Sequence, residues 1–273
     1  MKDAAVFPYY LSVMQATEFW DHVFSKGQES GYSRVEMPDL CDPILQRALA
    51  HFGSVENKTV IDLGCGRGAT SLFFVYHGAH VISVDLSEVA INNLSRYCQD
   101  NGIRHVTPVR TSAQELSQFG TVDFIFGSMI LHHIEPFDAF ARILRGVVKP
   151  GGKGFFWENN ARSKTLIWFR QNIVGKLWVP KWGDRDEFPL MPSEIMEMEK
   201  HFQVDVEYPE LYFFRLISAY LLRSRFMDLF EKLDRYFYKY PALRKYSYRQ
   251  YLCLTPKADV QGSFARAAGT PAI

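Results

Sequence analysis

The feature that most constrains the fold is a short apolar run that contains one acid and ends in three spaced glycines, VIDLGCGRG at residues 60–68. An apolar run of this length is typical of a strand buried on both faces of a parallel sheet. Glycines between a strand and a helix permit a tight turn and let a bound molecule approach the backbone closely. The stretch therefore predicts the first unit of an α/β fold, with a ligand site at its turn.

Short apolar strands alternate with helices on both sides of this turn, which predicts right-handed βαβ units around a parallel sheet. The strands are expected over residues 59–63, 79–84, 105–110, 122–127 and 154–158, and the helices over residues 69–76, 88–101 and 137–147. Beyond residue 160 the pattern loosens. Helices are expected there over residues 164–177, 193–202 and 214–240, and strands over residues 204–208 and 248–254.

This patterning divides the chain into four parts. We expect an N-terminal helical lid over residues 1–55, a cofactor-binding core over 56–160, an aromatic-rich helical region with the final strands over 161–256, and a disordered tail over 257–273. Small polar residues at a chain end are typical of disorder.

Composition excludes several classes of protein. A net charge of +1 over 273 residues gives no field for nucleic acid, so no nucleic-acid partner is expected. The four cysteines are widely spaced and show no zinc pattern, which favours reduced thiols in a cytoplasmic protein. The N-terminus lacks the basic and apolar regions of a signal peptide, and no apolar run is long enough to span a membrane.

An acid at the end of the strand that follows the glycine turn indicates that the ligand contains a nucleoside. Asp85 ends the next predicted strand, 17 residues after Gly68, where a carboxylate can accept two hydrogen bonds from a ribose diol. A dinucleotide and S-adenosylmethionine both carry this group. The second has a cationic amino-acid tail, which Asp62 would hold directly or through water. The alternative for Asp62 is an internal cap of the loop.

Four stretches in order resemble the motifs of class I S-adenosylmethionine-dependent methyltransferases. They are VIDLGCGRG, VISVDLS, DFIFGSMILHHIE and LRGVVKPGGKGFFWE, and the resemblance covers roughly residues 55–160. It implies a Rossmann-like sheet of seven strands, mostly parallel with an antiparallel last strand. It also implies S-adenosylmethionine as the cofactor and a small-molecule acceptor.

The resemblance assigns cofactor contacts along the chain. It implies that Asp85 and Leu86 hold the ribose, that Gly64, Cys65 and Gly66 line the cofactor, and that Ser128 and Met129 run along its methionine part. Gly127 is expected to be small because the cofactor lies against it. The family often has an Asp-Ala type pair where this chain has Thr111-Ser112-Ala113-Gln114, so Ser112 or Gln114 is expected to bond adenine, beside Ala113.

Two adjacent histidines and one acid are the candidates for proton transfer. His132 and His133 follow the fourth strand and Glu158 ends the fifth, at the sheet edge where α/β proteins bind ligands. We expect His133 or Glu158 to face the acceptor as a general base, with His132 beside them. The other reading is that these residues only hydrogen-bond neighbouring loops. No metal is expected, since adjacent residues rarely point at one ion.

The aromatic residues after residue 155 favour a hydrophobic acceptor. An aromatic, prenyl or otherwise apolar small molecule of secondary metabolism is our main expectation, and methylation at carbon, oxygen or nitrogen stays open. Two alternatives are a lipid or quinone methyltransferase at a membrane surface and a cofactor-binding scaffold without transfer activity. Membrane contact would use the basic face of the helix expected over residues 214–240, formed by Arg215, Arg223, Arg225, Lys232 and Arg235. Such a face is more often simply exposed to solvent.

The N-terminal aromatics are expected to close the site. Phe19, Trp20 and Tyr32 are predicted to form a lid that excludes water during transfer. Tyr9 and Tyr10 precede this lid and favour docking onto a second copy of the chain. We therefore expect a homo-oligomer.

Overall fold

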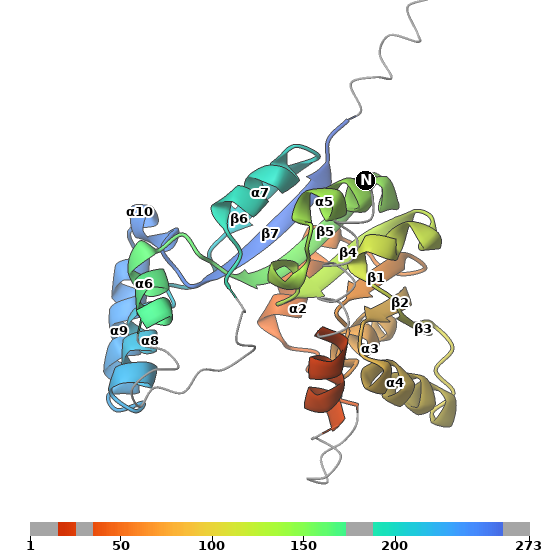
Figure 1. The fold of residues 1–273 in the computed structure, drawn as a ribbon, viewed down its shortest axis with the longest axis horizontal. Helices are drawn as coiled ribbons and strands as arrows, with labels where there is room; N and C mark the ends of the chain where they lie inside the picture. Colours follow the sequence, from red (N-terminus) through yellow and green to blue (C-terminus); the bar gives the residue numbers. More distant parts are fainter. Residues whose placement is uncertain (1–15, 26–34, 173–187, 259–273) are drawn as a thin grey trace, which may run out of the picture.

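A computed structural model describes residues 16–25, 35–172 and 188–258 of the chain. Its centre is one seven-stranded sheet in the order β3-β2-β1-β4-β5-β7-β6 (Figure 1). The strands are β1 (Thr59–Leu63), β2 (His80–Asp85), β3 (Val106–Arg110), β4 (Val122–Ser128), β5 (Val148–Asn159), β6 (Phe202–Glu207) and β7 (Arg249–Pro256). β1 to β5 pair in parallel, and β7 runs antiparallel to both β5 and β6. The predicted sheet of mostly parallel strands with an antiparallel last strand is confirmed.

Helices cover both faces of this sheet. They are α2 (Pro43–Phe52), α3 (Ala69–Tyr76), α4 (Glu88–Asp100), η1 (Ala113–Phe119), η2 (Leu131–His133), α5 (Phe137–Val147), α6 (Lys164–Asn172), α7 (Pro192–Glu199), α8 (Phe214–Leu221), α9 (Met227–Tyr238) and α10 (Pro241–Arg244). One face carries α5 and α7, whose Phe140, Leu144 and Met198 are fully buried in the largest apolar cluster. The other face carries α2 and α3, which bury Phe52 and Phe73 against the central strands.

The start of α4 shows how the sequence sets an element boundary. Ser87 takes an extended conformation, and its side chain accepts a hydrogen bond from the Ala90 N–H at 3.2 Å. This satisfies one of the amide groups that a helix start leaves without a partner, so Ser87 is the N-cap of α4. The cap fixes α4 directly behind Asp85, the residue that ends β2.

The first part of the chain contributes two helices with different positions. Residues 16–25 form an N-terminal helix, drawn in red in Figure 1, and α2 packs its Leu45, Ala48 and Phe52 on the sheet. The second helix is thus part of the core layer. The predictions for Tyr9, Tyr10, Tyr32 and the tail after residue 258 lie outside the described residues.

The helical cap, formed by α6, α8, α9 and α10, stands beside the sheet near the carboxyl end of β5 (Figure 1). The expected continuous helix over residues 214–240 is wrong, because the chain turns between α8 and α9. In this turn Arg223, Ser224 and Phe226 have positive φ angles, and the Ser224 N–H donates to the Ser218 carbonyl at 2.9 Å. The Ser218 hydroxyl donates to the Arg225 carbonyl at 2.6 Å and closes the turn.

Within the three described ranges, no helix is both long enough and apolar enough to cross a membrane.

Candidate cofactor and catalytic site

A cavity of about 290 Å³ lies at the carboxyl ends of β1, β2 and β4. It lies where open α/β sheets bind ligands, at the point where the strand order reverses beside β1. Eight predicted cofactor residues line this cavity: Gly64, Gly66, Asp85, Leu86, Ser112, Ala113, Ser128 and Met129. The sheet therefore brings together residues from four separate stretches of the chain.

The glycine turn after β1 forms one wall of the cavity. Gly64 has a φ angle of +74°, and a Cβ added there would stand 3.0 Å from the Ile130 side chain. Gly66 has a φ angle of +48° and would place a Cβ 3.4 Å from the Phe24 ring. Both positions require a conformation that glycine adopts without strain. A bound nucleoside can consequently approach the backbone here, as the predicted cofactor requires.

Asp85 is held rigidly at the rim of the cavity. Its two carboxylate oxygens accept hydrogen bonds from the Gly66 N–H and the Ser87 N–H, each at 2.9 Å. Burial raises the pKa of Asp85, although these backbone bonds act in the opposite direction. A carboxylate has about four lone-pair sites, so two remain for the hydroxyls of a ribose. The geometry fits the predicted ribose contact.

Asp62 and Cys65 lie beneath the glycine turn and do not line the cavity. Asp62 is 1% exposed and accepts a hydrogen bond from the Ser71 hydroxyl at 2.6 Å. Burial raises the pKa of Asp62 to about 7. Cys65 is buried in an apolar cluster with Leu72 and Leu94. A direct contact of either side chain with the cofactor stays a prediction.

The stretch expected to bind adenine begins the short helix η1. Ser112 and Glu115 form a capping box that fixes the start of this helix. The Gln114 side-chain amide donates to the Pro136 carbonyl at 3.1 Å. The adenine amino group donates and needs an acceptor, so this bond leaves the side-chain oxygen of Gln114 as a candidate beside Ser112. The contact of either residue with adenine stays a prediction.

The end of β4 places Met129 at the cavity, and protein packing explains the glycine two residues before it. Met129 lines the cavity in a left-handed conformation with a φ angle of 54°, and its N–H donates to the Trp157 carbonyl at 2.8 Å. Gly127 was expected to make room for the cofactor, and this is wrong. A Cβ at Gly127 would meet side-chain atoms of Ile130 and Phe156, each at 2.7 Å. Protein packing, not a ligand, excludes a side chain there.

The two histidines occupy different positions. His133 lines the cavity and meets the Trp20 ring edge-on, with ring centroids 5.7 Å apart. His132 points to the interior, where its Nδ1 lies 2.6 Å from the Glu158 carboxylate, and the two side chains are 1% and 0% exposed. The two imidazole rings contact each other, with centroids 4.1 Å apart. Of the two, His133 is the one that faces the site.

Glu158 supports the loop that carries these histidines. One of its oxygens accepts the Ile130 N–H at 2.8 Å and the Leu131 N–H at 2.6 Å, and the other faces His132. Glu158 is fully buried and does not line the cavity. Its geometry matches the expected internal hydrogen bonds to a loop, and a role as general base stays a prediction.

The N-terminal helix closes one side of the cavity. Ala16, Trp20 and Phe24, which lie on one helical face, line it. Asp21 fastens this helix to the start of α4 by accepting the Ser87 hydroxyl at 2.5 Å and the Val89 N–H at 3.2 Å. Of the predicted lid residues, Trp20 lines the cavity and Phe19 does not, and nothing in the sequence pointed to Asp21.

Other lining residues gave no usable pattern in the sequence. They are Leu63, Val84, Thr111, Ile130, Ile134 and Glu135. Most of them are apolar residues at strand ends, where they look like ordinary core residues. Across the three described ranges, no three His, Cys, Asp or Glu side chains gather as a metal site requires.

A glycine turn, an acid at the end of the next strand and a histidine after the fourth strand line one cavity of a Rossmann-like sheet, as a nucleoside-binding enzyme requires. A family model described as a methyltransferase domain matches residues 60–152. This match, together with the similar sequences and solved structures described next, supports a class I S-adenosylmethionine-dependent methyltransferase with S-adenosylmethionine as its cofactor. The expectation of a scaffold without transfer activity is therefore not supported.

Similar sequences carry one shared description. The ubiquinone biosynthesis O-methyltransferase of Rickettsia felis is 27% identical over 192 residues, which cover 69% of this chain and 76% of that relative. The enzyme of the same description from Bordetella avium is 29% identical over 150 residues, covering 52% of this chain and 60% of the relative.

Similar solved structures support the fold alone. The [4+2]-cyclase SpnF has a TM-score of 0.59 and 17% identity, covering 91% of this chain and 97% of its own. The geranyl diphosphate C-methyltransferase of Streptomyces coelicolor A3(2) has a TM-score of 0.52 and 16% identity, covering 78% of each chain. The different reactions in these names illustrate that a shared fold does not fix the chemistry.

Proposed function

We propose that this methyltransferase acts on a hydroxyl oxygen of an apolar aromatic ring of the kind found in quinone precursors. The relatives that cover most of this chain are described as ubiquinone biosynthesis O-methyltransferases, which supports the quinone alternative over an acceptor of secondary metabolism. The observation that carries the proposal is the position of His133. It presents an imidazole at the cavity beside Met129, where a hydroxyl about to be methylated needs a base.

The chemistry divides between cofactor and protein. When bound against the glycine turn and Asp85, the cofactor would supply an activated methyl group for the acceptor oxygen. His133 accepts the proton of the attacking hydroxyl. Trp20 and Phe24 cover the cavity and exclude water, which strengthens the electrostatic interactions inside. Glu158 and His132 hold the loop that carries His133, which keeps its imidazole in place at the cavity.

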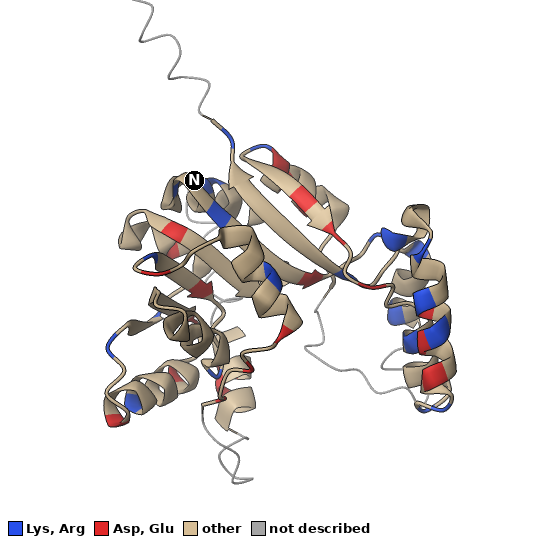
Figure 2. Cartoon of the chain, turned by 180° about the vertical axis from the view of Figure 1, so that it is seen from behind, with Lys and Arg blue, Asp and Glu red and all other residues tan. Residues whose placement is uncertain are grey.

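The proposal does not include membrane binding, because the expected basic face is partly neutralised. Arg215 pairs with Glu210 and Asp234, and Arg235 has its guanidinium 3.9 Å from Glu231. Figure 2 shows both signs of charge along this part of the cap. Such a mixed surface is typical of a solvated face.

The decisive experiment is methyl transfer from labelled cofactor to a set of acceptors. We expect label in a catechol with an apolar substituent, and none in the same ring when its hydroxyls are already methylated. The rate of the His133→Ala variant should be lower than that of the wild type by a factor of about 100 or more. The variant must still bind S-adenosylhomocysteine in calorimetry. Label on carbon instead of oxygen, or an unchanged rate in the variant, would reject the proposal.

A further inference from the structure

The helical cap contains a second cavity, which shares no lining residue with the cofactor cavity. It measures about 620 Å³ and lies between the start of α6, the segment before α8, and helices α9 and α10. Its apolar wall consists of Leu211, Phe213, Phe214, Phe237, Leu243 and Tyr246. This volume and this lining are within the range of small-molecule sites in proteins.

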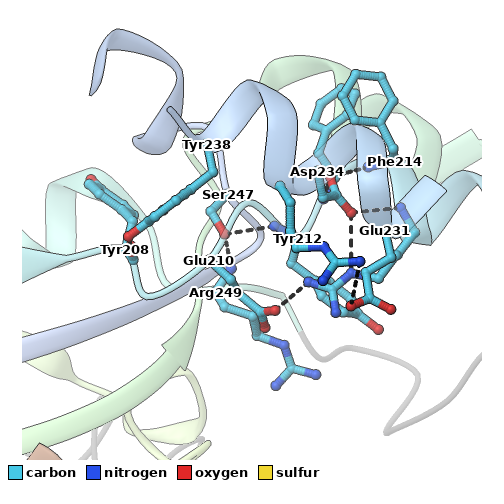
Figure 3. A network of polar contacts seen from close by, with 12 residues as sticks. Tyr208, Glu210, Tyr212, Phe214, Glu231, Asp234, Tyr238, Ser247 and Arg249 are labelled. Atoms are coloured by element: carbon cyan, nitrogen blue, oxygen red, sulfur yellow. Dashed lines mark hydrogen bonds and ion pairs between the residues drawn. The ribbon is translucent and has the colours of Figure 1, made fainter. Parts of the chain in front are cut away.

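A buried acid holds the aromatic wall in place. Asp234 of α9 is 1% exposed and accepts the N–H groups of Phe213, Phe214 and Arg215 at 3.1, 2.8 and 3.0 Å (Figure 3). The same carboxylate accepts the Arg215 Nε at 3.2 Å. Asp234 thereby caps the first turn of α8 from the neighbouring helix, and the Phe214 and Phe237 rings meet with centroids 5.2 Å apart. The cavity is therefore built, and is not a loose gap between helices.

The rim of the cavity carries three cations. Arg162, Lys164 and Lys245 line it, and all three residues are exposed. Within the described ranges, none of the three forms an ion pair with a carboxylate, although Lys245 lies over the Tyr246 ring at 5.4 Å. Two acids of the same region, Glu210 and Asp234, pair with Arg215 instead. An apolar wall thus ends at a positive rim.

We propose that this cavity binds a single-chain amphiphile with an anionic head, such as a long-chain carboxylate or alkyl phosphate. The chain lies against the six apolar side chains, and the head meets the cations at the rim. Burial of the methylene groups provides affinity, and the cations provide selectivity for the head. The proposal does not depend on the acceptor of the methyl group, since the two cavities share no residue.

The test is a titration of the full chain with cis-parinarate, a fluorescent long-chain carboxylate, below the concentration at which it forms micelles. We expect saturable binding, and binding at least about tenfold weaker for the uncharged methyl ester of the same chain. The double variant Lys164→Glu with Lys245→Glu should weaken parinarate binding by about tenfold or more. The matched control, Arg96→Glu with Arg104→Glu, changes the same charge on exposed residues of another region and should have no effect.

A second variant tests the wall without touching the charge. Leu243→Trp fills the cavity and should abolish parinarate binding, while circular dichroism and S-adenosylhomocysteine binding stay unchanged. Equal affinity for acid and ester, or parinarate binding that survives both variants, would overturn the proposal. Sedimentation with phosphatidylglycerol vesicles in the absence of parinarate binding would also overturn it, because the cations would then serve a membrane surface.

Discussion

At the scale of single residues, the site separates acids that face the ligand from acids that lie beneath it. Asp85 stands at the rim with both oxygens fixed by backbone N–H groups, whereas Asp62 is buried below the glycine turn. Burial raises the free-energy cost of ionising Asp62, and the nearby charge of Asp85 raises it further. A cationic tail of the cofactor would relieve this cost at Asp62.

This arrangement predicts a pH dependence of cofactor binding. Burial raises the pKa of Asp62 from 3.8 to about 7, so below pH 7 the folded protein without cofactor holds a proton there. A cationic tail favours the ionised form, so binding must release this proton. We therefore expect the affinity for S-adenosylhomocysteine to fall as the pH decreases below 7, by at most about tenfold per pH unit.

The measurement is calorimetry between pH 5.5 and 8, in buffers with different heats of ionisation that report proton release. Asp62→Asn should bind more weakly above pH 7 and show a flatter pH profile. The sign for stability follows from the same shift. Since the folded-state pKa is raised, the contribution of Asp62 to the free energy of unfolding decreases as the pH rises from 3.8 to about 7. An affinity that is independent of pH, with no proton released, would contradict the electrostatic role of Asp62.

At the scale of elements, the loop after β4 is organised by a side chain from β5. Glu158 accepts two backbone N–H groups of this loop and contacts His132, although it stands 28 residues after Ile130 in sequence. Glu158→Gln keeps the shape but loses the charge. We expect it to lower the free energy of unfolding by about 1–3 kcal/mol.

Activity separates this positioning role from a catalytic one. If Glu158 only holds the loop, Glu158→Gln should raise the cofactor KM and reduce kcat less than His133→Ala does. Urea denaturation and steady-state kinetics measure both effects, with Glu199→Gln as an exposed control on α7. A pH–rate profile that loses one limb in Glu158→Gln while keeping the wild-type KM would instead identify Glu158 as the base.

The contact between the N-terminal helix and α4 is a second link between elements. Asp21 accepts two donors at the positive end of α4, next to the ribose-binding acid. Asp21→Ala removes charge-assisted bonds of about 1.5–3 kcal/mol, so the cofactor KM should increase by about tenfold or more. Because the core does not depend on this helix, the thermal midpoint should change little.

Limited proteolysis and cofactor titration check this prediction. Cleavage within residues 16–25 should become faster in Asp21→Ala, and S-adenosylhomocysteine should protect the variant less than the wild type. Glu18→Ala changes an exposed acid on the same helix and serves as the control. Equal KM values for the two variants would show that Asp21 does not hold the helix over the site.

At the scale of the whole molecule, the sequence predicted the strands, turns and helices that are determined by residues close together in the chain. β1, the glycine turn and α3 follow from an apolar run, three glycines and helical spacing, all local features. Contacts between segments far apart in the chain were not indicated by any local sequence pattern. Asp21 meets Ser87 across 66 residues, and Gly127 is small because Phe156 of another strand fills the space beside it. The break between α8 and α9 was not predicted either, because the helical spacing of apolar residues continues through the turn.

Asp234 holds two helices of the cap together, which predicts that its loss affects the cap more than the sheet. Asp234 links α9 to α8 through three backbone N–H groups and Arg215, and it lies far along the chain from the cofactor motifs at residues 60–68. Asp234→Ala leaves Arg215 with fewer partners and the first turn of α8 without its cap. Breaking such a buried pair costs about 3–5 kcal/mol, so the cap should open locally while the sheet stays folded.

Hydrogen exchange followed by mass spectrometry measures this local opening. In Asp234→Ala, amides of α8 and α9 should exchange at least about tenfold faster, whereas β1 and β4 should keep wild-type protection and S-adenosylhomocysteine should bind normally. Asp228→Ala, an exposed acid on the same helix, is the matched control. If exchange accelerated equally in the cap and in β4, the two regions would unfold as one unit. The cap would then be an integral support of the methyl-transfer site, because no part of it would fold independently of the sheet that binds the cofactor.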